Sequence, residues 1–236
     1  MPQLTVRVLT ERKNLKGSTL ITGFHGVGQT GYIATSYMIH ALKAERIGFV
    51  EVGNPPPWVG TAEGGLVTPF EIYSKGKTVL VKLEFSPHRS EEAEFAKTIA
   101  NWAVEEKFKD AILVGGLDIS YRDNNDDFCV VPTGAYSTKA KAFNAPILEP
   151  GLLVYGPLAV MLSEFEVHDF PAIAVLPYAE TSRADPAAAA VAIRKIAKSY
   201  NFKVNLGELV KDAKFIEKEF EQKTRMTKRS LQRMYA

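Results

Sequence analysis

Apolar runs of strand length alternate with helical patterns along most of this 236-residue chain. The strand-like runs occupy residues 4–9, 19–24, 47–52, 71–73, 78–85, 111–114, 128–131 and 173–176. The helical patterns occupy residues 33–42, 90–107, 138–143, 155–165 and the stretch after Asp185. Alternation of this kind predicts an α/β fold, with a mostly parallel or mixed sheet between helix layers.

Two of the predicted helices have recognisable start signals. Ser90 precedes Glu91 and Glu92, so we expect Ser90 to be the N-cap and the acids to lie in the first turn. Asp185 precedes Pro186, which is the pattern of an N-cap carboxylate followed by a proline at the first helical position. Both signals predict where helices begin and therefore where strands must end.

The end of the chain differs from the rest. No internal repeat or low-complexity linker is visible, so we predict one α/β domain over residues 1–205, followed by a helix and tail over residues 206–236. The helix has an apolar stripe that fades after Phe220, so we expect its last part to protrude as an exposed arm. The stripe consists of Leu206, Leu209, Val210, Ala213, Ile216 and Phe220.

Charge separates the same two parts. Residues 197–236 hold 10 Lys and Arg against 5 Asp and Glu, whereas residues 1–196 hold 19 against 22. A mildly acidic body argues against nucleic-acid binding by the domain itself. Weak nucleic-acid binding by the basic arm remains an alternative, and it predicts a steep dependence on salt.

Cysteine usage and hydropathy predict the compartment. Cys129 is the single cysteine, so it forms no internal disulfide and offers no thiol cluster for zinc. The first residues lack the apolar core of a signal peptide, and the longest near-apolar run, residues 151–162, is too short to span a bilayer. We therefore expect a cytoplasmic protein with no membrane partner.

A glycine-rich segment at residues 23–31 contains the pattern G-x-G-x-x-G, formed by Gly26, Gly28 and Gly31. With Glu51 twenty residues later, it resembles a dinucleotide fingerprint. A strand precedes the one that feeds this loop, and a proline-rich stretch follows Glu51, which favours a tight structural turn instead. His25 lies in the loop, where α/β folds place ligands.

These residues support an alternative function. The chain would then be a phosphorylase, a hydrolase or a nucleotide-dependent enzyme that uses Gly26, Gly28, Gly31 and His25. No other pattern supports catalysis, because the sequence contains no G-x-S-x-G elbow and no P-loop. We therefore predict no catalytic residue and no cofactor.

Metal binding is not expected either. The acidic and amide residues at positions 118 and 123–127 lack the spacing of a calcium loop, so a solvated turn or an acidic contact surface is favoured. The four histidines lack zinc-site spacing. Cys129 lies in a strand-like run, where a buried thiol usually fills space rather than reacting.

The sequence ends in Met234, Tyr235 and Ala236. A hydrophobic residue, a tyrosine and a final residue with a free carboxylate form a docking tail, because a pocket can bind the aromatic ring and pair the carboxylate with a cation. Lys228, Arg229 and Arg233 precede the tail and would steer it toward an acidic surface.

Several motifs together resemble the proteasome assembly chaperone 2 family, in its archaeal branch. They are the G-F-x-G-x-G turn at 23–28, Leu-Val-Gly-Gly at 113–116, the helix entry formed by Gly151 and Tyr-Gly-Pro-Leu at 155–158, Asp-Pro-Ala-Ala at 185–188 and the final tripeptide. The resemblance implies a fold like that of nucleoside phosphorylases and homo-oligomerisation, with partnership by a paralogue left open.

The resemblance also implies a function. The protein would be a proteasome assembly chaperone or an ATP-independent proteasome activator, and not an enzyme. Its tail, Met234 to Ala236, would insert between α-subunits of the proteasome core particle, with the Arg233, Arg229 and Lys228 side chains beside the contact.

Overall fold

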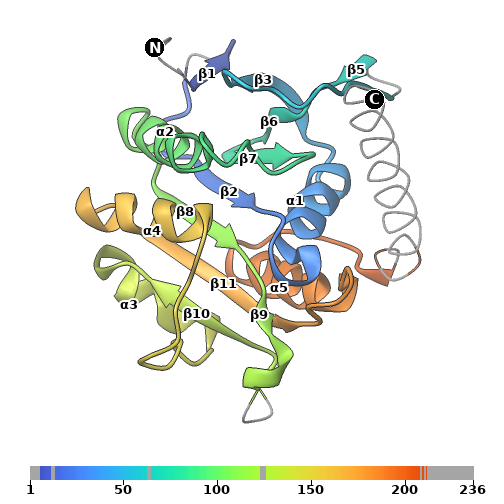
Figure 1. Ribbon diagram of the computed structural model, residues 1–236. Helices are drawn as coiled ribbons and strands as arrows, with labels where there is room; N and C mark the ends of the chain where they lie inside the picture. The colour runs from blue at the N-terminus through green and yellow to red at the C-terminus, as the bar shows by residue number, and fades with distance from the viewer. Residues whose placement is uncertain are drawn as a thin grey trace.

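The computed structural model describes residues 6–11, 14–62, 65–122, 126–207, 209 and 211. Within them, the strands form one large mixed sheet in the order β1-β3-β6-β7-β2-β8-β11-β10, with β9 paired to β11 (Figure 1). The strands of this sheet are β1 (Arg7–Thr10), β2 (Thr19–Gly23), β3 (Glu45–Glu51), β6 (Phe70–Lys75), β7 (Thr78–Leu83), β8 (Asp110–Val114), β9 (Leu117–Asp118), β10 (Phe128–Pro132) and β11 (Ala172–Ala179). A separate hairpin joins β4 (Gly60–Ala62) and β5 (Gly65–Val67).

The centre of the sheet is parallel and its two sides are antiparallel. Strands β7, β2, β8 and β11 run parallel to their neighbours in this central block. On one side β6, β3 and β1 follow in antiparallel pairs, and on the other side β10 pairs antiparallel with β11. The prediction of a mostly parallel or mixed sheet is therefore confirmed.

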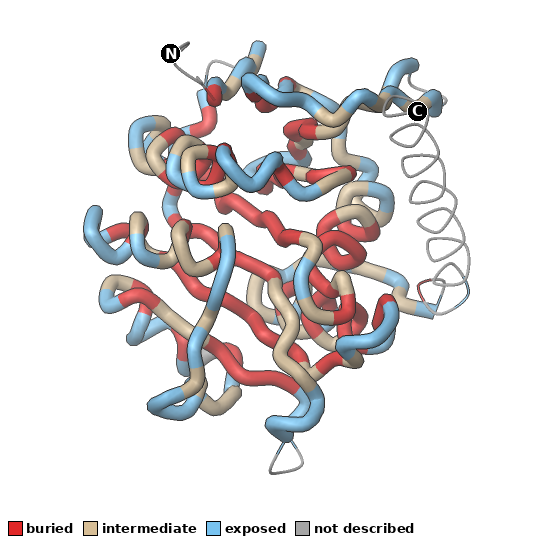
Figure 2. The backbone as a smooth tube through the Cα atoms, viewed as in Figure 1, coloured by how far each residue is buried: buried red, intermediate tan, exposed pale blue. Residues whose placement is uncertain are grey.

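Helices cover both faces of the central strands. One face packs against α2 (Glu92–Glu105) and α4 (Pro157–Val167), through side chains that include Phe95 and Phe165. The other face packs against α1 (Thr30–Ala41) and α5 (Pro186–Ser199), through side chains that include Ile33 and Ile193. Every residue of β2 and β8 is buried, as Figure 2 shows for the middle of the molecule. Burial on both faces explains why these strands contain apolar runs, Leu20 and Ile21 in β2 and Ala111 to Val114 in β8.

The two helix starts behave differently. Asp185 caps α5 as predicted, because its Oδ1 accepts the N–H of Ala188 at 3.0 Å and its Oδ2 accepts the N–H of Glu180 at 3.1 Å. The prediction for Ser90 is wrong, because α2 begins at Glu92 and the Ser90 hydroxyl pairs with His88 Nδ1 instead. Glu91 is buried there and its carboxylate accepts the N–H of Asn54. That contact ties the start of α2 to the loop after β3.

The shortest strands, β4, β5 and β9, were not predicted. The hairpin β4–β5 and the two-residue strand β9 are too short for a period-2 pattern to be visible. A short helix α3 (Ser137–Ala140) followed by a 3₁₀ turn (Lys141–Phe143) matches the predicted helical segment at 138–143. From the apolar stripe near the end of the chain, Leu209 is fully buried against the α1–α5 side, while Val210, Ala213, Ile216 and Phe220 lie outside the described residues.

Candidate functional site

The glycine-rich segment forms the turn between β2 and α1. A Cβ atom added to Gly31 would lie 2.4 Å from the carbonyl oxygen of Val114 and 2.6 Å from the backbone nitrogen of Phe24. Gly28 has a φ of 59°, a left-handed conformation that favours glycine. Gly31 therefore allows close packing of α1 on the sheet, and Gly28 allows a tight turn. These roles agree with the interpretation of the pattern as a structural turn.

Glu51, the acidic residue that a dinucleotide site would require, does not lie beside the glycine turn. Glu51 ends β3, and two strands, β6 and β7, separate β3 from β2 in the sheet. In a dinucleotide fold the acid follows a strand adjacent to the glycine turn. Glu51 is half-exposed and forms an ion pair with Arg7. The G-x-G-x-x-G pattern of Gly26, Gly28 and Gly31 is thus not accompanied by the geometry that a nucleotide would need.

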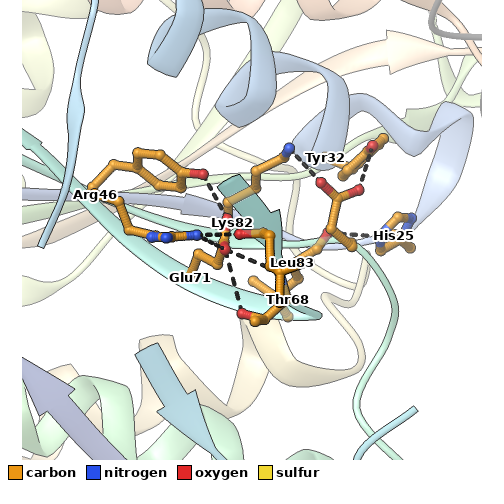
Figure 3. Close-up of polar contacts among 10 residues, drawn as sticks. His25, Tyr32, Arg46, Thr68, Glu71, Lys82 and Leu83 are labelled. Carbon is orange, nitrogen blue, oxygen red and sulfur yellow. Dashed lines mark hydrogen bonds and ion pairs between the residues drawn. The ribbon is translucent and has the colours of Figure 1, made fainter. Parts of the chain in front are cut away.

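His25 belongs to a partly buried polar cluster at the end of β2 (Figure 3). Its ring stacks on Tyr32 with centroids 4.5 Å apart, and its Nε2–H donates to the carbonyl oxygen of Leu83 at 2.9 Å. The buried carboxylate of Glu84 accepts the Tyr32 hydroxyl at 3.0 Å and pairs with Lys82. These side chains satisfy one another, as the side chains of a structural cluster do.

A second polar cluster lies beside it on the adjacent strands (Figure 3). Glu71 is almost fully buried and its Oε1 accepts Arg46 at 2.7 Å and the backbone N–H of Thr68 at 2.9 Å. The Tyr73 hydroxyl donates to Glu71 Oε2. Burial and the neighbouring Glu71 carboxylate raise the pKa of Tyr73 above its ordinary value. The arrangement keeps this tyrosine neutral and joins β3, β6 and the loop before β6.

Neither cluster was predicted, although part of the signal was present. Lys82 and Glu84 stand two residues apart on a strand-like run, between apolar residues. Charges at that spacing share one face of the strand, which marks either an exposed face or an internal ion pair. The partners Tyr32 and Arg46 come from distant parts of the sequence, so only the fold identifies them.

A cleft of about 500 Å³ opens at the carboxyl end of β2 and β8. We name it the carboxyl-edge cleft. Its three walls are the turn after β2, the segment after β8, and the extended segment that leads into α4; Glu92 of α2 and Leu176 of β11 complete it. It is lined by Phe24, His25, Gly26, Val27, Glu92, Val114, Gly115, Gly116, Leu117, Asp118, Tyr121, residues 151–158 and Leu176. This edge is where α/β folds bind ligands, and His25 lies at it, as its position in the sequence indicated.

Asp118, the first residue of the acidic stretch, lines this cleft. Asp118 accepts the backbone N–H of Ser120, and that hydrogen bond holds its pKa below the ordinary value. Asp127 pairs with Arg122 at 3.0 Å, and residues 123–125 lie outside the described part of the chain. The described residues contain no group of three or more His, Cys, Asp or Glu that could hold a metal ion.

The remaining candidates are separate from the cleft. His88 pairs with Ser90, and His168 lies 3.6 Å from Glu164 at the end of α4. Cys129 is buried in β10, and burial raises the pKa of its thiol to about 11, so it stays protonated and unreactive at neutral pH. None of the described helices has the length and apolar character needed to cross a membrane.

The predicted docking residues lie outside the described residues. They are Lys228, Arg229, Arg233, Met234, Tyr235 and Ala236. Their assignment continues to rest on the sequence pattern alone.

Comparison with known proteins identifies relatives along nearly the whole chain. The model of the PAC2 family matches residues 20–224. The uncharacterized protein MJ1210 of Methanocaldococcus jannaschii is 23% identical over 229 residues, which cover 92% of this chain and 89% of that protein.

Solved structures share the fold. The crystal structure of Pyrococcus furiosus PbaA, described as an archaeal homolog of proteasome-assembly chaperone, superimposes with a TM-score of 0.83 at 23% identity, covering 96% of this chain and 99% of PbaA. Pyrococcus furiosus PbaB, described as an archaeal proteasome activator, gives a TM-score of 0.71 at 16% identity, covering 94% of this chain and 99% of PbaB. These likenesses extend over the complete α/β body.

Proposed function

The chain belongs to the PAC2 family, and from this premise we propose that it is a proteasome-binding adaptor, either an assembly chaperone or an ATP-independent activator. The observation that carries the proposal is the likeness of the body to PbaA and PbaB, whose descriptions name proteasome assembly and proteasome activation. The final tripeptide of the sequence supports the same function independently of the fold.

The proposed contact is made by Met234, Tyr235 and Ala236, which insert into pockets between α-subunits of the core particle. A tyrosine suits such a pocket because its ring is apolar and its hydroxyl can remain hydrogen-bonded. The preceding cations Lys228, Arg229 and Arg233 would accelerate encounter with an acidic rim rather than add much affinity.

A contact of three residues is weak on its own, so the proposal includes self-association. Several copies joined through residues 1–205 would present several tails to one α-ring. Linked tails raise the avidity by about 10²–10⁴ when all of them can bind at once. Residues 206–236 would then be the binding appendage, whose first residues pack on the body at Leu209. The number of subunits and any paralogue partner would set the arrangement of the tails.

The proposal assigns neither catalysis nor a cofactor to the glycine turn. His25 hydrogen-bonds to the backbone and stacks on Tyr32, while Glu84 is occupied by Lys82 and Tyr32. Such mutual satisfaction supports a structural role for this cluster.

The test is a binding assay of the full-length protein against the proteasome core particle from the same cells. Tyr235→Ala is expected to reduce binding at least about tenfold, because it removes the aromatic anchor. Met226→Ala is the matched control, since it removes an apolar side chain from the same basic segment outside the tripeptide. Equal binding by Tyr235→Ala and the unaltered protein would overturn the proposed contact.

A second variant addresses the carboxylate. Adding several residues after Ala236 keeps every side chain and moves the terminal charge, so binding should fall as in Tyr235→Ala. Retained binding by the extended protein would mean that the side chains act without the terminal charge.

A further inference from the structure

We propose that the carboxyl-edge cleft is a docking groove for an extended apolar peptide segment of a partner protein that carries a lysine or arginine. The proposal concerns a surface of the α/β body. It is separate from the tail contact proposed above and makes no use of residues 206–236.

The first argument is the state of the chain between residues 151 and 156. Leu153, Val154 and Tyr155 belong to no helix or strand, and the described part of the chain provides no backbone hydrogen bond to their N–H or C=O groups. A peptide in an extended conformation can pair with such groups, which is the mode of β-strand addition.

The second argument is the alternation of exposure along this segment. The side chains of Leu153 and Tyr155 are 63% and 76% exposed, and most of the segment is exposed in Figure 2. Val154, between them, packs against the core formed with α2 and α4. The inner side chain therefore fixes the segment in place while the two outer side chains are open to a partner, so little ordering cost remains for binding.

The third argument is the rest of the lining. Tyr121 is 51% exposed and also lines the cleft, together with the apolar side chains of Phe24 and Val27. A cleft lined by aromatic and aliphatic groups from all three of its walls suits an apolar occupant. Recognition of apolar segments commonly uses large side chains arranged in this way.

Charge determines the rest of the occupant's chemistry. Asp118 and Glu92 both line the cleft, and among the described residues no lysine or arginine does so. An apolar segment with a cation would place that charge near the two carboxylates, whereas an acidic segment would be repelled.

The experiment uses two synthetic fluorescent heptapeptides and the full-length protein. One probe has leucine and valine on both sides of a central lysine, and the other has glutamate in place of the lysine. Fluorescence anisotropy should show saturable binding of the lysine probe that is at least about threefold tighter than binding of the glutamate probe.

Three variants separate the contributions. Leu153→Ser combined with Tyr155→Ser should weaken binding of the lysine probe at least about tenfold, while Val167→Ser, a change at an exposed valine outside the cleft, should leave it unaltered. Glu92→Gln combined with Asp118→Asn should abolish the preference for lysine while retaining the turn hydrogen bond, since asparagine also accepts from Ser120.

The outcomes distinguish a peptide-binding groove from a surface that joins two copies of this chain. Equal binding by the serine double variant, or no saturable binding of the lysine probe, would overturn the proposal. A change of oligomeric state in the serine double variant, measured by sedimentation velocity, would also overturn it, because the surface would then be an interface between copies of this chain. Tyr235→Ala should bind the probe normally, so failure of the tail contact would not affect this result.

Discussion

The two halves of the sheet are held together by different means. In the parallel half, β2, β8 and β11 are buried on both faces, and the backbone of α1 approaches the sheet so closely at Gly31 that no Cβ atom fits. In the antiparallel half, buried and more exposed residues alternate from Ile47 to Glu51 in β3. The buried Glu71 carboxylate forms an ion pair with Arg46 of β3. The close backbone approach at Gly31 is the feature to test in the first half, and the Arg46–Glu71 ion pair is the feature to test in the second.

The difference follows from where helices lie. Strands covered on both faces have little access to water, so most side chains there are apolar, and the buried Asp110 carboxylate in β8 accepts hydrogen bonds from Thr19 and Tyr200. A strand with one partly open face can carry a charged row if each charge has a partner. The two halves should therefore respond to different kinds of substitution.

The largest effect is expected from Gly31→Ala in the parallel half. The three atoms nearest to the new methyl group would be backbone atoms of β2, β8 and the turn between β2 and α1, which cannot rotate away. We expect a loss of about 3 kcal/mol or more in the free energy of unfolding, measured by chemical denaturation.

Gly26→Ala is the matched control from the same pattern. A Cβ atom at Gly26 meets nothing within 4 Å, and its φ of −113° suits any residue. The free energy of unfolding should change by no more than about 0.5 kcal/mol. Equal effects of the two substitutions would mean that close approach of the backbone does not hold the parallel half together.

The second effect in size is expected from Glu71→Gln in the antiparallel half. Glutamine keeps the shape but removes the charge that faces Arg46. With its amide oxygen toward Arg46 and Thr68, its N–H₂ group faces the Tyr73 hydroxyl, which must then accept instead of donate. Because the Arg46 side chain is still 31% exposed, water can solvate part of its unpaired charge. We therefore expect a loss of about 2 kcal/mol in the free energy of unfolding. Thermal and chemical denaturation of the variant would measure it, and an unchanged midpoint would contradict the role given to this pair.

The sequence predicted the parallel half better than the antiparallel half. Its strands contain recognisable apolar runs, and the Asp185–Pro186 start of α5 was identified from local chemistry alone. Ser90 is not the N-cap of α2. The residue after it, Glu91, is buried and accepts a hydrogen bond from Asn54, which is distant in the sequence. The clusters around Glu71 and Glu84 were missed for the same reason, since each joins residues far apart in sequence.

Within the candidate site, one wall could likewise be predicted from the sequence better than another. The position of His25 at the carboxyl edge of the sheet could be predicted because a glycine turn after a strand identifies that edge. The third wall, residues 151–158, was predicted only as the entry to a helix. Residues 152–155 belong to no helix or strand, and they line the same cleft as His25 and Tyr121. That placement depends on tertiary contacts that a local pattern does not contain.

The third effect concerns the two helix starts. Asp185→Ala removes an acceptor for two backbone N–H groups, so we expect a loss of about 1–2 kcal/mol in the free energy of unfolding. Ser90→Ala removes a hydroxyl that caps no helix and should cost no more than about 0.5 kcal/mol. Both residues were predicted as caps, so denaturation of both variants tests whether a predicted cap stabilises the protein only where the structure contains its hydrogen bonds.

The smallest effect is expected from Glu51→Gln, which makes the same chemical change as Glu71→Gln within the same half of the sheet. Glu51 pairs with Arg7, but their side chains are 45% and 61% exposed, so water solvates both ions when the pair is broken. Exposed pairs contribute about 0–1 kcal/mol, and salt screens them further. Denaturation at low and high salt should show a small loss that disappears with salt. A loss as large as that of Glu71→Gln would mean that burial does not distinguish the two carboxylates, and that charge is equally important across the whole antiparallel half.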